Sequence, residues 1–142
     1  MTTVDTKELV GLGAGMEIPE EISTDKVWAV LLIKIKQPNL FLPVTDVVTR
    51  PIEGGGTYRE MSMGPSRIIE NIYYDESILE VNFNVTNDEN EHVNTILVDN
   101  NGKRTLEFFK RNSVTKERVE WAVPKQTVLT GMVKIFDMAR NM

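Results

Sequence analysis

Between residues 45 and 112 the chain alternates short strand-like runs with turns, and no helix-like stretch interrupts them. The run at 78–86 shows the pattern best, because apolar residues take every second position and Glu80, Asn82 and Asn84 fill the others. Strands joined only by short turns need no crossover, so they pair antiparallel. The chain is therefore constrained to an antiparallel meander, one face of which must be covered by something else.

The turns contain the residues that tight connections require. Glycines at 54–56, Gly64-Pro65 and Asp99 to Gly102 supply the backbone conformations of such turns. Residues 112–122 are expected to form a polar connection. The six predicted strands of the meander lie at residues 45–52, 57–63, 66–74, 78–86, 92–98 and 104–111.

The segment 123–141 has the longest helical pattern in the chain. Pro124 suits a first helical turn, where its missing N–H costs nothing. Because apolar residues recur every three or four positions, one face of this helix must be buried. That stripe consists of Val128, Met132, Ile135 and Ala139, and it is widened by Leu129, Val133 and Phe136.

Three shorter elements precede the meander. An edge strand is expected at about 12–18, and a helix begins at Ser23-Thr24-Asp25. Pro38 ends that helix at Gln37, and a one-turn helix is expected at 39–43.

Together these elements predict an α+β fold, in which a curved antiparallel sheet of about seven strands wraps around the long C-terminal helix. The 142 residues fit a single domain, with residues 1–10 as a flexible arm. A curled sheet and a long helix do not fill the space between them completely, so the gap is the natural place for a ligand.

Composition excludes several classes of function. A net charge of −5 argues against nucleic acid as a partner. The chain has no cysteine and a single histidine, His92, so thiolate chemistry and His-pair metal sites are excluded and no metal is expected. The glycines at 11, 13 and 15 lack the dinucleotide spacing, and no cofactor is expected. Neither a signal peptide nor a membrane span is found, which makes the cytoplasm the default location.

Charge is unevenly distributed along the chain. From Arg104 onward there are eight Lys or Arg against four Asp or Glu, whereas the preceding residues hold eight against seventeen. This predicts ion pairs between the last elements and the rest of the sheet; an anion-attracting patch is the alternative.

Three residues are candidates for acid or base catalysis. Glu60 and Glu70 lie at nearly symmetric positions about the turn at Gly64-Pro65. If they face inward, burial would raise at least one pKa and suit a proton shuttle; otherwise they face water or pair with Arg59 and Arg67. His92 is either a general base at the cavity rim or a solvated residue at a strand end.

The candidates for ligand contact are strand and helix residues expected on the cavity walls. Tyrosines can orient a ligand carbonyl, and methionine adapts to irregular shapes, although both also fill ordinary cores. The set comprises Tyr58, Met61, Tyr73, Phe83, Val128, Met132, Ile135 and Phe136.

Several segments resemble the AtaL-like group of the START/Bet v 1-like superfamily, also called SRPBCC. The pattern S-T-x-x-V-W-x-x-L-L-x-K lies at 23–34 and is followed by Q-P-N-L-F-L-P at 37–43. The hairpin G-G-G-T-Y-R-E at 54–60 and the strands at 67–70 and 78–83 fit the same group.

This resemblance implies a helix-grip fold with a hydrophobic cavity between the sheet and the C-terminal helix. Relatives bind lipids, sterols, hormones or polyketides, and some catalyse cyclisation or dehydration or act as co-chaperones. The first expectation is therefore binding of a hydrophobic small molecule by a monomer or weak homodimer. The alternatives are a polyketide cyclase, dehydratase or isomerase that uses Glu60, Glu70, Tyr73 or His92, and a co-chaperone-like module that uses the outer sheet face.

Overall fold

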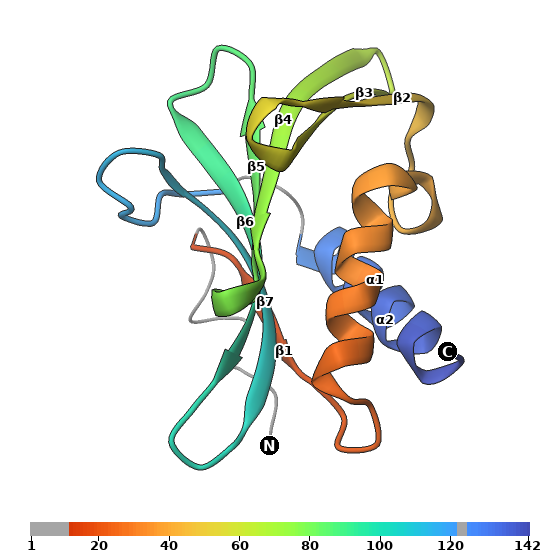
Figure 1. Ribbon diagram of the computed structural model, residues 1–142, viewed down its shortest axis with the longest axis vertical. Helices are drawn as coiled ribbons and strands as arrows, with labels where there is room; N and C mark the ends of the chain where they lie inside the picture. The colour runs from red at the N-terminus through yellow and green to blue at the C-terminus, as the bar shows by residue number, and fades with distance from the viewer. Residues whose placement is uncertain (1–11, 122–124) are drawn as a thin grey trace.

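The computed structural model describes residues 12–121 and 125–142. Its strands form one antiparallel sheet in the order β1-β7-β6-β5-β4-β3-β2, and both helices lie on the same side of that sheet, which curves around them (Figure 1). We call the side that faces the helices the inner face. The elements are β1 (Ala14–Glu17), α1 (Thr24–Lys36), η1 (Pro38–Leu40), β2 (Thr45–Ile52), η2 (Glu53–Gly55), β3 (Gly56–Met63), β4 (Ser66–Asp75), η3 (Glu76–Ile78), β5 (Glu80–Val85), β6 (Asn90–Val98), β7 (Arg104–Asn112) and α2 (Lys125–Arg140).

The predicted α+β architecture of seven antiparallel strands and a C-terminal helix is confirmed. Strands β2 to β7 form the expected meander, each paired with the next along the chain. The first strand instead joins the far edge, where Ala14 pairs with Phe108. Gly13 makes this approach possible, since a Cβ there would lie 2.5 Å from the Phe108 carbonyl oxygen and its φ is +125°.

Helix α1 begins and ends where the sequence predicts. The side chain of Ser23 accepts a hydrogen bond of 3.2 Å from the backbone N–H of Lys26, and Pro38 follows the last turn. The buried face consists of Val27, Trp28, Val30, Leu31, Lys34 and Ile35. Lys34 is the charged member of an otherwise apolar stripe.

Helix α2 buries the predicted stripe of Val128, Met132, Ile135 and Ala139, with Phe136 and Gly131 beside it. Together with the inner side chains of the sheet and the face of α1, it forms one continuous core. The expected flexible arm at 1–10 and the predicted position of Pro124 lie outside the described residues.

Two strands of the meander begin two residues away from their predicted starts, and the one-turn helix expected at 39–43 lies at Pro38–Leu40. Strand β5 begins at Glu80 rather than at Ile78, because Leu79 has a left-handed φ of 52° that ends η3. Strand β6 begins two residues early, at Asn90. The polar connection after β7 runs back along that strand, where Arg118 bridges to Arg111.

The uneven charge is explained by ion pairs across the fold, as predicted. Cations late in the chain pair with earlier carboxylates: Lys110 with Asp88, Arg140 with Glu21, and Arg111 with both Glu80 and Glu91.

In the part of the chain that the structure describes, neither helix has the length and apolar character needed to cross a bilayer. The same residues contain no group of three or more His, Cys, Asp or Glu side chains placed to hold a metal ion.

Candidate functional site

A cavity of about 380 Å³ lies between the inner face of the sheet, the end of α1 and the first half of α2. Most of its wall is apolar, formed by Leu42, Pro43, Met61, Met63, Ile68, Phe83, Val85, Phe108, Trp121, Val128 and Gly131. The polar part of the wall consists of Lys34, Arg59, Glu70, Asp88, His92, Asn94 and Thr127. The volume falls in the range of small-molecule sites, as does the combination of apolar walls with a few polar groups.

Arg59 and Glu70 form a buried ion pair on adjacent strands. Arg59 pairs directly with Glu70 in the β3–β4 register, and its Nε and Nη2 both donate to Glu70 Oε1, at 2.9 and 2.7 Å. Arg59 Nη1 donates to the carbonyl oxygens of Lys34 and Ile35, at 3.1 and 3.0 Å. The guanidinium therefore neutralises Glu70 and ties the end of α1 to the sheet.

Lys34 extends from α1 into the same region and is only 6% exposed. Its Nζ donates a 2.9 Å hydrogen bond to Asn94 Oδ1 and lies 5.0 Å from the ring centroids of Phe83 and Phe108. Burial, reinforced by the positive charge of Arg59 and opposed by Glu70, lowers the pKa of Lys34 to about 7.

His92 lies on the wall of the cavity and is half-buried. Its ring meets Trp121 edge to face, with the centroids 5.4 Å apart. Burial, followed by the nearby charge of Lys110, lowers the pKa of His92 below its ordinary value. The imidazole is therefore neutral at pH 7 and able to accept a proton from a bound molecule.

Of the predicted candidates, Glu70, His92, Met61, Phe83 and Val128 line the cavity. The other three helix candidates, Met132, Ile135 and Phe136, are buried in the core and do not line it. The cavity touches α2 at Thr127, Val128 and Gly131, so residues further along the helix pack against other parts of the core.

Tyr58 was wrongly predicted at the cavity, because side chains alternate along β3, and Glu60 adopts the predicted alternative, in which it faces outward and pairs with Arg67. Arg59 faces inward, so both neighbours face outward. There the Tyr58 hydroxyl donates a 2.6 Å hydrogen bond to Glu60, and Arg67 pairs with Glu60 at 3.3 Å. The Tyr58 hydrogen bond lowers the pKa of Glu60, which is the opposite of the shift expected for a buried proton shuttle.

Tyr73 was also wrongly predicted at the cavity. It lies on the outer face of β4 and is 39% exposed. Its ring covers Gly56, where a Cβ would lie 2.6 Å from the Tyr73 Cε1 atom. Tyr73 therefore packs against a glycine of the neighbouring strand.

The sequence did not lead us to propose Lys34 or Asn94 as site residues, and Arg59 was named only as an alternative ion-pair partner of the two glutamates, the role it has with Glu70. A signal existed for Lys34, which follows Val27, Val30 and Leu31 at the spacing of one helix face. A lysine on such a stripe must be buried or must extend to a polar group, and here it does both.

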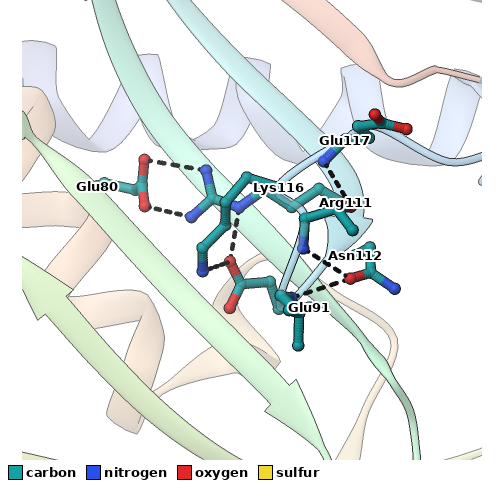
Figure 2. A network of polar contacts seen from close by, with 8 residues as sticks. Glu80, Glu91, Arg111, Asn112, Lys116 and Glu117 are labelled. Atoms are coloured by element: carbon teal, nitrogen blue, oxygen red, sulfur yellow. Dashed lines mark hydrogen bonds and ion pairs between the residues drawn. The ribbon is translucent and has the colours of Figure 1, made fainter.

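A second network of charged side chains lies on the outer face of the sheet, shown in Figure 2. Arg111 Nη2 lies 2.6 Å from Glu80 Oε1, and Arg111 Nε lies 2.6 Å from Glu91 Oε2. Lys116, on the loop after β7, places its Nζ 3.2 Å from Glu91 Oε2. Asn112 stabilises this loop, because its side-chain oxygen accepts hydrogen bonds from two backbone N–H groups of the loop. Two cations thus meet two carboxylates.

Neither protein-family models nor curated proteins match this chain. Among solved structures, the chain is similar to the crystal structure of TTHA0849 from Thermus thermophilus, with a TM-score of 0.58 and 13% sequence identity. The similarity covers 90% of this chain and 95% of that chain. The two chains therefore share their overall fold, and at this identity the likeness extends to nothing beyond the fold.

Proposed function

We propose that this protein binds a hydrophobic small molecule of lipid, polyketide or aromatic type in the cavity between its sheet and α2. The observation that carries the proposal is the cavity of about 380 Å³ itself, walled mainly by apolar side chains. Apolar side chains that line a cavity of this size stay in contact with water until a molecule covers them, so their burial favours an apolar ligand.

The element order supports assignment to the helix-grip fold of the START/Bet v 1-like superfamily. A curved antiparallel sheet around a C-terminal helix is the arrangement that the AtaL-like resemblance implies, and the shared fold of TTHA0849 agrees with one continuous domain of this shape. The cavity also favours ligand binding over a co-chaperone-like module, which would act through the outer sheet face and needs no cavity.

A neutral fluorescent probe tests this proposal. N-Phenyl-1-naphthylamine brightens in apolar surroundings, so titration into the protein should give saturable enhancement at one site. Gly131→Leu should weaken that enhancement strongly, since Gly131 lines the cavity and the added side chain would take up part of its volume. An added Cβ would lie 3.6 Å from the Phe41 carbonyl oxygen, which is an ordinary contact.

Val133→Leu is the matched control, because Val133 lies on the exposed side of the same helix. It should bind the probe as the wild type does. Equal binding by the wild type and Gly131→Leu would place the probe elsewhere and contradict the proposal.

The position of His92 favours one alternative, a proton-transferring enzyme of cyclase, dehydratase or isomerase type. The neutral imidazole lies on the cavity wall with Glu70, which suits it to act as a general base. Such an enzyme would lose turnover in a His92→Gln variant and still bind the neutral probe. Loss of both, or of neither, would exclude the base role.

A further inference from the structure

Around Lys34, the cavity wall holds more positive than negative charge, since Asp88, the other lining carboxylate, pairs with Lys110. Arg59 and Glu70 form a closed pair, since two guanidinium nitrogens bind one carboxylate oxygen and the third binds two backbone carbonyls. Lys34 is the second buried cation beside this single carboxylate. Counted as ions, the three side chains sum to one positive charge.

Lys34 differs in its partner from Arg59, which is also buried, and from the half-buried Arg111. Arg59 and Arg111 each contact a carboxylate at 2.6 or 2.7 Å, whereas the hydrogen-bond acceptor of Lys34 is the neutral amide of Asn94. Within residues 12–121 and 125–142, no carboxylate lies within 4.0 Å of Lys34 Nζ. The Phe83 and Phe108 rings stabilise an ammonium through their faces but do not neutralise it.

The ammonium has three donors, and the structure assigns one of them to Asn94. The side chain lines the cavity, so a group within the cavity can reach it. Burying an unpaired charge is costly, and an anionic ligand group would remove that cost by supplying the missing counter-ion.

The other charged groups around the cavity do not fill this role. Glu70 is held by Arg59, and Asp88 lies 3.7 Å from Lys110. His92 is neutral at pH 7, because burial lowers its pKa. Burial also lowers the pKa of Lys34, because the charged form of this side chain is unfavourable without a counter-ion.

We infer that the ligand is an amphipathic acid, whose carboxylate or phenolate binds Lys34 while its apolar body lies against Met61, Phe83, Phe108 and Val128. This inference rests on the proposed ligand-binding function and specifies its chemistry. Apolar walls alone would accept neutral molecules of suitable size, so the buried lysine determines selectivity for an acid over its neutral analogue.

Three ligands with one common chain test the inference. Dodecanoate, 1-dodecanol and dodecylamine are compared below their aggregation concentrations at pH 6.5, by displacement of bound N-phenyl-1-naphthylamine. Dodecanoate should bind about 10- to 100-fold more tightly than the alcohol, as expected for one buried charge-assisted hydrogen bond. The amine should bind most weakly, because the cavity already holds an unpaired cation.

Lys34→Met removes the charge and retains much of the apolar side chain, so it should bind acid and alcohol equally. Lys36→Met is the control, because Lys36 is exposed two residues away on the same helix. Circular dichroism of each variant establishes that it folds, and the three-ligand comparison in the wild type stands even if Lys34→Met does not fold.

The inference is wrong if dodecanol or dodecylamine binds as tightly as dodecanoate, or if dodecanoate does not displace the probe. Binding of the neutral probe in either case would leave the proposed hydrophobic cavity intact. Failure of the probe to bind at all would instead contradict the proposed function, and the inference with it.

Discussion

The two faces of the sheet each carry a network of charged side chains, and they differ in charge balance. On the outer face, Arg111 and Lys116 meet Glu80 and Glu91, and every member has an opposite partner (Figure 2). On the inner face, the carboxylate of Glu70 is bound by Arg59, and the second cation, Lys34, contacts an amide and two aromatic rings instead. A balanced network is complete as it stands, whereas an unbalanced one beside a cavity leaves a place for a ligand.

The largest expected loss of stability comes from removing Arg59, the cation that binds Glu70 on the inner face. Arg59→Met would leave Glu70 buried without its counter-ion and should lower the free energy of unfolding by about 3–5 kcal/mol. Urea denaturation measures the change. The double variant Arg59→Met/Glu70→Leu should lose less than the single one, since no charge is then left unpaired, and an equal or greater loss would contradict this account.

The corresponding change on the outer face should cost less. Arg111→Met should lower the free energy of unfolding by about 2 kcal/mol, because Glu80 is partly exposed to water and Glu91 keeps Lys116 as a partner. Binding of dodecanoate should stay within twofold of the wild type. Weakened binding would show that the two faces are coupled and would contradict their separate roles.

The unbalanced inner network should make stability depend on pH through Lys34. Its folded pKa of about 7 lies below the ordinary 10.5, so the unfolded chain binds the proton more tightly between these values. This contribution to stability is therefore lost as pH falls from 10.5 towards 7 and is constant below 7.

Subtracting the Lys34→Met curve from the wild-type curve isolates this group. Between pH 7.5 and 9.5 the difference should rise by about 1.4 kcal/mol per pH unit at most, measured by urea denaturation. A difference that is flat across this range would mean that Lys34 keeps its ordinary pKa in the folded protein.

The smallest effect is expected at Glu60, which faces outward and pairs with Arg67 instead of lining the cavity. Glu60→Gln should leave probe and dodecanoate binding unchanged and should not measurably shift the urea midpoint, because the side chain lies on the outer face beside Arg67. Glu70→Gln, in contrast, should be destabilising because Arg59 loses its carboxylate. Matching behaviour of the two variants would contradict the assignment of faces.

Much of the fold was predictable from residue patterns. Alternation placed the meander, Ser23 and Pro38 bounded α1, and the apolar stripe located α2. Each of these patterns depends on residues that are close together in the chain, so it can be recognised in the sequence alone. The pairing of β1 with β7 was not predicted, because a four-residue edge strand carries no information about its distant partner.

The site was less predictable, because strand alternation fixes only relative positions. Tyr58 and Met61 are three residues apart on one regular strand, so they cannot both face the cavity. The same argument separates Glu70 from Tyr73 on β4. Since charged residues occupy both faces of β3, hydrophobicity alone did not decide which residue pointed inward, although Met61 and Arg59 share the correct face.

The pairing of β1 with β7 also has a consequence for the order in which the protein folds. Neighbouring hairpins within β2 to β7 close short loops, whereas joining Ala14 to Phe108 closes most of the chain. Such long-range contacts form late and slow the approach to the native state. During synthesis, β1 cannot pair until β7 has left the ribosome, so this strand completes the sheet last.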